Sequence, residues 1–244
     1  MKVILLAGGS PKDQIEFDGY KSIIKLKGIS MIRYVVDALS STDDIEEIII
    51  VGNIPDLPSV LDGNTYKLLE EGPTIMDNVL RGLDFAGDED FILIATCDIP
   101  LIKGDIIKGF IEEGIKADVD LFYPIIDKET CINGYPDIKR TFASLREGEF
   151  TGGNLILLKP KAISKIERVG RYMIDNRKNP LKMSAFFGLG IITKFLTKTL
   201  SIAQLEEYIE DRFDISAKAY HCKNPEICHD LDDPKEIEIF EKYL

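Results

Sequence analysis

The chain has few basic residues for its size. It carries 30 Lys and Arg against 42 Asp and Glu among 244 residues, a formal net charge of −12 at pH 7. Nucleic-acid binding needs basic surface to displace counterions from phosphates, so this composition argues against a nucleic-acid partner. An acidic chain is better suited to recruiting cations to a few carboxylates.

Long apolar runs are also missing, and cysteines are few. A membrane-spanning helix needs about 20 apolar residues, and no run approaches that length. The apolar start ends at Gly8, too early for a signal peptide, and no small-residue cleavage site follows it. We therefore expect a cytoplasmic protein with no membrane contact. Four cysteines in a chain of this length are too few for a disulfide framework: Cys97, Cys131, Cys222 and Cys228.

Short apolar runs alternate with helical patterns in the first half of the chain. This alternation predicts right-handed βαβ units, and thus an α/β domain with a mostly parallel central sheet and helices on both faces. Ligands bind such sheets beyond the carboxyl ends of the strands. The predicted strands are Val3–Ala7, Ile48–Val51, Tyr66–Leu69 and Phe91–Ala95, and the predicted helices are Met31–Leu39, Pro73–Phe85 and Asp105–Ile115.

The second half is less regular, and we expect it to form a small late lobe within a single domain. Its predicted strands are Leu121–Ile126 and Leu155–Leu158, with a polar loop at Glu129–Pro136 between them. Its predicted helices are Pro180–Leu200, Ile202–Arg212 with Ser201 as N-cap, and Pro234–Leu244 capped by Asp232 or Asp233.

Two glycines directly follow the first predicted strand. Gly8 and Gly9 let the backbone approach an anion, and successive N–H groups can cradle phosphate oxygens. Lys12 lies in the polar loop that follows, and Lys21 at its end supplies a cation for the same phosphates. The segment has neither a Walker A motif nor a dinucleotide-binding fingerprint. A plain strand-to-loop turn explains the two glycines alone equally well.

Carboxylates recur at two places where a metal could bind. Asp98 follows the fourth predicted strand, and Pro100 fixes the chain after it. Asp230 and Asp232 are two apart, so in extended chain they face the same way. Mg²⁺ prefers one or two such carboxylates together with substrate phosphates. The structural alternative is capping, by Asp98 at a turn and by Asp232 or Asp233 at the terminal helix.

Taken in order, these segments resemble the MobA-like NTP transferases, the molybdenum cofactor guanylyltransferase-like branch of the nucleotidyltransferases with a glycosyltransferase-A-like fold. The family's opening glycine loop is matched by Leu6–Gly9, and its K-x-L-x-x-L-x-G segment by Lys21–Gly28. Its D-x-P-L-[IL] segment is matched by Asp98–Ile102, and its D-x-D-x-P-E-[DE]-[LI] helix entry by Asp230–Ile237. The resemblance spans nearly the whole chain.

The resemblance implies a Rossmann-like nucleotidyltransferase domain over 1–244. Residues 1–116 would be the nucleotide-binding half, and 117–244 the acceptor-binding half with the C-terminal helix. Such an enzyme transfers a nucleoside monophosphate from an NTP to a phosphorylated or hydroxylated small-molecule acceptor and releases pyrophosphate. The expected partners are these two small molecules, without nucleic acid or membrane, and a homodimer is left open.

The same resemblance implies the site residues. Lys21 and Asp98 would be catalytic, and Asp98, Asp232 and Asp230 would hold Mg²⁺. The acceptor would attack the α-phosphorus in line, with no protein nucleophile. The implied nucleotide-binding residues are Leu6, Ala7, Gly8, Gly9, Lys12, Lys21, Gly72, Pro73 and Asn78.

Acceptor binding is implied at three further residues. Gly153 and Asn154 lie where relatives bind the acceptor, and Asn can both donate to and accept from a hydroxyl, although a tight turn explains the pair as well. Lys178 could hold an acceptor phosphate or belong to a solvated helix start. The chain departs from the family at two positions. It lacks an arginine after the second glycine, so Lys12 is the only cationic side chain near that loop, and it has Tyr20 before Lys21 where the family has Pro or Asp.

Two alternatives stay open. A glycosyltransferase of the same architecture needs a mid-chain Asp-x-Asp, and Asp118-Val119-Asp120 has this spacing, but at the wrong end of a strand. A non-catalytic nucleotide-binding sensor is compatible with the missing arginine. The segments His221-Cys222 and Cys228-His229 match no zinc-binding spacing, so we favour a reduced thiol pair on a loop.

Overall fold

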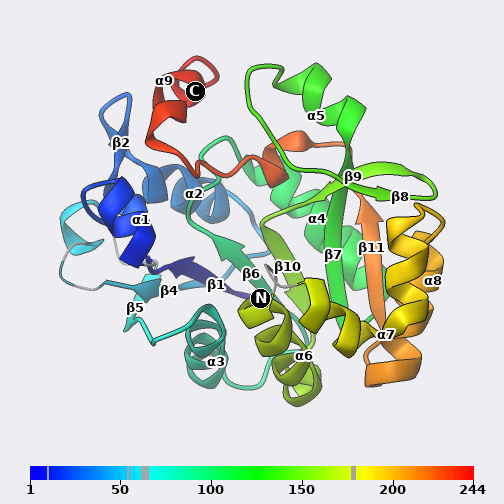
Figure 1. The fold of residues 1–244 in the computed structure, drawn as a ribbon. Coiled ribbons are helices and arrows are strands. Elements are labelled where there is room, and N and C mark those ends of the chain that lie inside the picture. The colour runs from blue at the N-terminus through cyan, green and yellow to red at the C-terminus, as the bar shows by residue number, and fades with distance from the viewer. Residues whose placement is uncertain (10, 54, 56, 62–65, 177–179) are drawn as a thin grey trace.

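Most strands of the protein form one large mixed sheet. The computed structural model describes residues 1–244 except 10, 54, 56, 62–65 and 177–179 (Figure 1). The strands of this sheet are β1 (Lys2–Ala7), β4 (Glu47–Gly52), β5 (Tyr66–Glu70), β6 (Ile92–Thr96), β7 (Leu121–Asp127), β8 (Ala143–Leu145), β9 (Gly148–Gly152), β10 (Leu155–Leu158) and β11 (Ala217–His221). Their order is β5-β4-β1-β6-β10-β7-β9-β8, and β11 pairs with β7.

Strand direction divides the sheet into two parts. β5, β4, β1 and β6 run parallel, as the strand–helix alternation predicts. β10 runs antiparallel to both β6 and β7, and β9 runs antiparallel to β7. The α/β class is therefore confirmed, with a mixed sheet. Because β10 is antiparallel, its start lies at the edge where β1 and β6 end, with Leu155 opposite Ala95.

Helices cover both faces of the sheet, as predicted. Alternate residues of a strand point to opposite faces, so Val3 packs into one apolar cluster with α2 (Met31–Ser40) and α4 (Gly104–Ala117), and Ile4 into another with α3 (Ile75–Ala86). The helices are α1 (Pro11–Glu16), α2 (Met31–Ser40), α3 (Ile75–Ala86), α4 (Gly104–Ala117), α5 (Lys128–Gly134), α6 (Ile163–Asn176), α7 (Pro180–Leu196), α8 (Ile202–Phe213) and α9 (Ile237–Glu241).

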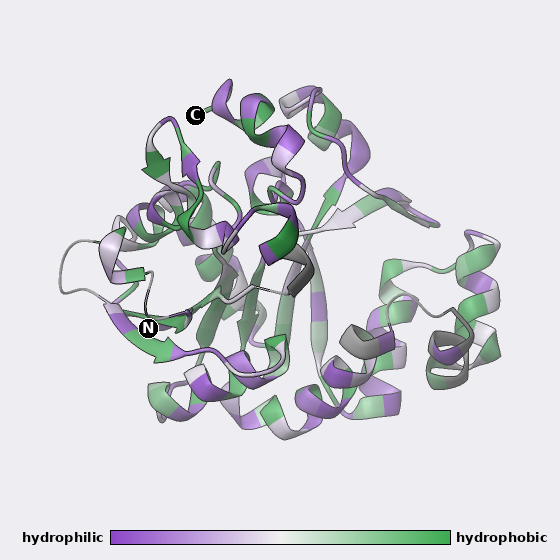
Figure 2. Cartoon of the chain, turned by 60° about the vertical axis from the view of Figure 1, so that its left-hand side comes forward, coloured by the Kyte–Doolittle hydropathy of each residue, from purple (hydrophilic) through white to green (hydrophobic). Residues whose placement is uncertain are grey.

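Burial on both faces explains the composition of the central strands. Three consecutive isoleucines of β4, Ile48, Ile49 and Ile50, are all buried. Such a continuous apolar run is typical of a strand that is covered on both faces. Figure 2 shows the apolar residues gathered in the strands, while the helices alternate polar and apolar positions. Gly82 lets α3 approach β1 closely, because a Cβ there would lie 2.6 Å from Ile4 Cγ2.

A third apolar cluster holds the C-terminal segment over the carboxyl edge of the parallel strands. Leu231 and Phe240 pack there with Leu26 of a two-stranded ribbon, β2 (Lys25–Leu26) and β3 (Ile29–Ser30). The Leu231 N–H also donates to the Asp98 carbonyl at 2.9 Å. The C-terminal segment is thereby fixed beside the end of β6.

The structure corrects several local predictions. The predicted loop at Glu129–Pro136 contains the helix α5, and the predicted loop at Lys12 contains α1. Pro73 precedes α3 rather than opening it, since Thr74 is the N-cap. The predicted helix at Pro234–Leu244 is a 3₁₀ turn over Pro234–Glu236 followed by the short α9.

Ser201 caps α8 as predicted, through a reciprocal pair of hydrogen bonds with Gln204.

In the described ranges, no helix is both long and apolar enough to cross a membrane.

Candidate active site

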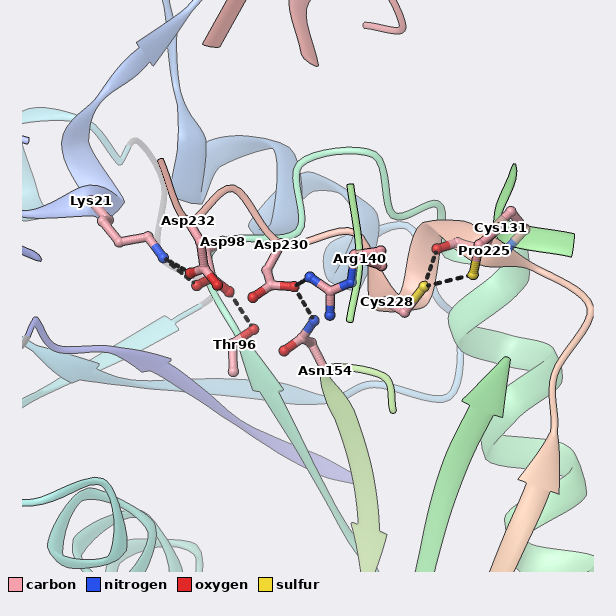
Figure 3. A network of polar contacts seen from close by, with 10 residues as sticks. All are labelled: Lys21, Thr96, Asp98, Cys131, Arg140, Asn154, Pro225, Cys228, Asp230 and Asp232. Carbon is pink, nitrogen blue, oxygen red and sulfur yellow. Dashed lines mark hydrogen bonds and ion pairs between the residues drawn. The ribbon is translucent and has the colours of Figure 1, made fainter. Parts of the chain in front are cut away.

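Lys21 bridges two carboxylates at the carboxyl edge of the sheet. It lies in a 3₁₀ turn after the loop that follows β1, and its side chain is buried. Its Nζ donates to Asp98 Oδ2 and to Asp232 Oδ1, both at 2.8 Å (Figure 3). Burial alone would lower the pKa of Lys21, but the charges of Asp98 and Asp232 outweigh it and raise this pKa well above its usual value. Lys21 is therefore a permanent cation here.

Asp98 is held from its other side by Thr96. The Thr96 hydroxyl donates to Asp98 Oδ1 at 2.6 Å. Thr96 is the last residue of β6, so the strand end itself orients the carboxylate. Burial would raise the pKa of Asp232, but Lys21 lowers it. Asp232 thus favours its charged form.

Asp230 lies on the far side of this pair and belongs to a second network. Arg140 forms an ion pair with its carboxylate, and Asn154 Nδ2 donates to Asp230 Oδ1 at 3.4 Å (Figure 3). Burial, together with the charge of Asp98, raises the pKa of Asp230 against the opposing effect of Arg140. No local sequence pattern predicts this role of Arg140, because the pairing joins positions 90 residues apart.

The three aspartates fit a magnesium site. One oxygen from each of Asp98, Asp230 and Asp232 lies within 4.8 Å of the others. A set made only of carboxylate oxygens suits a hard cation such as Mg²⁺, which is bound through one or two carboxylates plus substrate phosphates. The donor chemistry thus agrees with the ion that the sequence predicts.

The glycine loop after β1 meets the loop before α3. The Gly9 N–H donates to Glu71 Oε2 at 3.2 Å, and the Tyr20 hydroxyl donates to Glu71 Oε1 at 2.8 Å. Asn78 Oδ1 accepts from the Gly72 N–H at 2.6 Å, and a Cβ on Gly8 would collide with Glu71. The two loops therefore bring together four predicted nucleotide-binding residues, Gly8, Gly9, Gly72 and Asn78. The contact of Glu71 with Gly9 shows that an anionic oxygen can reach the loop backbone.

A polar cavity of about 470 Å³ opens beside the aspartates. Its position follows from the antiparallel β10, which brings Gly153 and Asn154 to the same edge as Asp98. The cavity is lined by basic, neutral polar and acidic side chains, among them Tyr123, Lys139, Arg140, Thr151, Asn154 and Asp232.

Three predicted residues lie close in sequence to the glycines of the site, and two lysines lie partly or wholly outside the described part. Leu6 and Ala7 are in β1, and Pro73 is exposed beside Gly72. Lys12 belongs to α1, but its side chain lies outside the described part. Lys178 also lies outside the described residues.

The mid-chain Asp-x-Asp has structural contacts. Asp118 ends α4 in the left-handed conformation and pairs with Lys159, and the Asp120 carboxylate accepts from the Ser216 N–H. These contacts argue against the metal motif of a glycosyltransferase.

The prediction that Cys222 and Cys228 form a thiol pair is wrong. Cys228 Sγ lies 3.6 Å from Cys131 Sγ, whereas Cys222 Sγ contacts Asn224. All four cysteines are buried and free, as a reduced protein requires.

Comparison with known proteins decides the family. The family profile described as MobA-like NTP transferase domain matches residues 3–181, which is more than half of the chain. The chain belongs to the MobA-like NTP transferase family. It is accordingly a nucleotidyltransferase-family enzyme, and the resemblance read from the glycine loop and the two aspartate segments is confirmed at family level.

Individual relatives agree with this family. A probable molybdenum cofactor guanylyltransferase of Natranaerobius thermophilus is 30% identical over 131 residues, which are 52% of this chain and 60% of that protein. The chain thus matches less than two thirds of this relative's length.

Solved structures show the same fold. A hypothetical transferase from Thermus thermophilus superposes with a TM-score of 0.83 at 28% identity, covering 97% of this chain and 98% of that one. The 4-diphosphocytidyl-2C-methyl-D-erythritol synthase of Anaerococcus prevotii has a TM-score of 0.61 at 15% identity over 99% and 94% of the two chains, a likeness in fold alone.

Proposed function

We propose that this MobA-like protein transfers a nucleoside monophosphate from an NTP to a phosphorylated or hydroxylated small-molecule acceptor, with Mg²⁺ bound and pyrophosphate released. The observation that carries this proposal is the cluster of Asp98, Asp230 and Asp232 around Lys21, between the glycine loop and a polar cavity. In this proposal residues 1–116 bind the nucleotide, and 117–244 bind the acceptor and close the site within one domain.

The nucleotide would lie along the glycine loop. The Gly8–Gly9 backbone and Lys21 would contact the triphosphate, and Gly72 and Asn78 the base. The Gly9 N–H donates to Glu71 in this structure. A phosphate oxygen could replace Glu71 as the acceptor of this hydrogen bond. Lys21 would turn from the carboxylates to the phosphates, whose negative charge also favours the ammonium form.

Asp98, Asp232 and Asp230 would hold Mg²⁺. The ion, when bound, neutralises negative charge on the phosphates. Asp232 and Asp98 face the glycine loop through Lys21, whereas Asp230 faces the cavity through Arg140 and Asn154. The three carboxylates therefore stand between the two proposed substrate positions.

The acceptor would occupy the 470 Å³ cavity. Lys139 and Arg140 offer cationic donors for an acceptor phosphate, and Asn154 offers a donor and an acceptor for a hydroxyl. The acceptor oxygen would attack the α-phosphorus in line, and positioning with charge neutralisation would supply the catalysis without a protein nucleophile.

Two measurements test this proposal. The first is a thermal-shift screen of the four NTPs with Mg²⁺, in which a cognate NTP at a hundredfold excess over its Kd adds about 2.7 kcal/mol to stability. The second is pyrophosphate release from the cognate NTP with pools of phosphorylated and hydroxylated acceptors. Release of a nucleoside diphosphate from a nucleotide sugar would instead identify a glycosyltransferase, and binding without any release a sensor.

Asp98→Asn tests the role of the carboxylate. We expect a melting temperature close to that of the wild type, because the amide is nearly isosteric, and pyrophosphate release reduced by orders of magnitude, because the charge is lost. Asp118→Asn is the matched control, since Asn also tolerates the left-handed cap conformation. Full activity in Asp98→Asn would remove Asp98 from the metal site.

A further inference from the structure

A second group of metal-ligating side chains lies outside the carboxylate cluster. Cys131 comes from α5, Cys228 ends a 3₁₀ turn over Pro225–Cys228, and His229 follows it directly. One ligand atom from each of these residues lies within 4.8 Å of the others. All three side chains are buried, and Cys228 and His229 have an exposed fraction of 0%.

The imidazole of His229 has no hydrogen-bond partner among the described residues. Both Nδ1 and Nε2 are buried and unpaired. The ring packs edge-on against Tyr135, with 4.9 Å between the ring centroids. A buried polar group left without a partner costs about 1–3 kcal/mol, so native structures rarely keep one without a reason. A ligand on a ring nitrogen would satisfy it.

The separation of the two sulfur atoms fits a shared metal ion. Cys131 Sγ and Cys228 Sγ are 3.6 Å apart, far beyond a disulfide bond of about 2.05 Å. Two sulfurs bound at about 2.3 Å to one tetrahedral zinc ion lie about 3.8 Å apart. The thiols thus need little movement to bind one ion.

We propose that Cys131, Cys228 and His229 bind a thiophilic metal ion, which we represent by Zn²⁺. Thiolate and imidazole ligands select such ions over Mg²⁺, which prefers the carboxylates nearby. On binding, two metal–sulfur bonds and one metal–nitrogen bond form, and two thiol protons pass to solvent. Two thiolates balance the divalent charge, and a water molecule takes the fourth position.

The site connects α5 to the segment that carries the active-site aspartates. Cys228 and His229 immediately precede Asp230, and Figure 3 shows Arg140 between the Asp230 carboxylate and the thiol pair. A metal ion at this point would tie α5 to the 228–232 segment and hold Asp230 and Asp232 in place. This role is structural, and the ion itself takes no part in the chemistry of the proposed transfer reaction.

Cobalt titration of the full-length protein tests the site directly. The protein is reduced, freed of metal with a chelator and titrated anaerobically with Co²⁺. We expect one equivalent to produce sulfur-to-cobalt charge-transfer absorption in the near ultraviolet, with tetrahedral visible bands that Zn²⁺ displaces. Zn²⁺ alone should raise the melting temperature of the metal-free protein.

Variants locate the ligands. Cys131→Ser and His229→Gln should weaken Zn²⁺ binding more than about a hundredfold, since loss of a residue that only hydrogen-bonds to a metal ligand already costs up to that factor. Cys97→Ser and Cys222→Ser remove the other two buried thiols and should keep the cobalt spectrum. Asp98→Asn should keep it too, because carboxylate oxygens give no sulfur charge-transfer band.

Several results would overturn the proposal. One is a wild-type Co²⁺ titration without the charge-transfer band, and this needs no variant to fold. Another is an unchanged band in Cys131→Ser. A third is a Cys131–Cys228 disulfide in the purified protein that, after reduction, leaves thiols unable to bind Co²⁺. None of these outcomes bears on pyrophosphate release, so they leave the proposed transferase activity untouched.

Discussion

Lys21 sets the charge balance of the candidate site. Its ammonium group contacts two of three clustered carboxylates, and the third is paired with Arg140. The motif that contains Lys21, and the two that contain Asp98 and Asp232, could be predicted from the sequence because each follows a recognisable strand or precedes a helix. The contact of Glu71 with Gly9 could not, since it depends on how two loops approach one another.

The first prediction is that Lys21 competes with Mg²⁺. Lys21→Met keeps most of the length of the unbranched side chain but removes the cation from Asp98 and Asp232. Without nucleotide, Mg²⁺ should therefore bind the variant more tightly than the wild type, while pyrophosphate release falls about 10²–10³-fold, the loss typical of one missing charge-stabilising donor. Calorimetric titration with Mg²⁺ and the release assay measure the two effects.

The control for this substitution is Lys128→Met. It removes a half-exposed lysine that pairs with Glu149, so the net charge changes equally. Weaker Mg²⁺ binding by Lys21→Met than by this control would show that Lys21 supports the carboxylates rather than competing for them.

At the scale of secondary-structure elements, burial in the sheet made strands predictable, and short helices were missed. α5 contains Thr130, Asn133 and Gly134, which are poor helix formers, so its sequence is typical of a loop. Asp127 caps it by accepting from the Thr130 N–H at 2.8 Å, and Cys131 packs against Cys228. This helix is therefore stabilised by its cap and by tertiary contacts, which local pattern does not reveal.

In the C-terminal turn, helix capping and the proposed metal binding belong to different aspartates. Asp233 caps the 3₁₀ turn by accepting from the Lys235 N–H at 3.0 Å, whereas Asp232 faces Lys21. The melting temperature of Asp232→Asn should stay within a few degrees of the wild type, because Lys21 still forms its ion pair with Asp98. Its rate of pyrophosphate release should fall by orders of magnitude. Asp233→Asn should keep both properties, since Asn caps about as well as Asp.

Calorimetry and the release assay on both variants decide between the two roles. If Asp233→Asn were the inactive variant, the metal ligand would lie one residue further along. If neither variant lost activity, the segment would serve only to cap the turn, and Asp98 and Asp230 would remain as candidate ligands.

At the scale of the whole molecule, the site is assembled from distant parts of the chain. Asp98 follows a parallel strand, whereas Asn154 precedes an antiparallel one and Asp230 lies near the C-terminus. The parallel half could be predicted because buried strands alternate with amphipathic helices. In the antiparallel half the apolar runs of β7 and β10 were predicted as strands, but the direction of β10, the β8–β9 hairpin and α6 were not, because no comparable alternation marks them.

The stability of the whole molecule should depend on pH through His229. Burial, with Arg140 nearby, lowers the pKa of His229 to about 4 in the folded protein, against about 6.5 in the unfolded chain. Above pH 6.5 neither state binds the proton, so His229 contributes no pH dependence. Between pH 6.5 and 4 only the unfolded state binds it, so the free energy of unfolding falls as the pH drops, by about 1.4 kcal/mol per unit.

Urea unfolding of the metal-free protein at pH 7 and pH 5 measures this effect. The wild type should lose about 2 kcal/mol more than His229→Gln over this interval, because glutamine binds no proton there. His221→Gln, which removes the exposed histidine instead, should keep the wild-type loss. Equal losses in the wild type and His229→Gln would mean that the buried imidazole is protonated as readily as in the unfolded chain, and that its ring nitrogens have a partner after all.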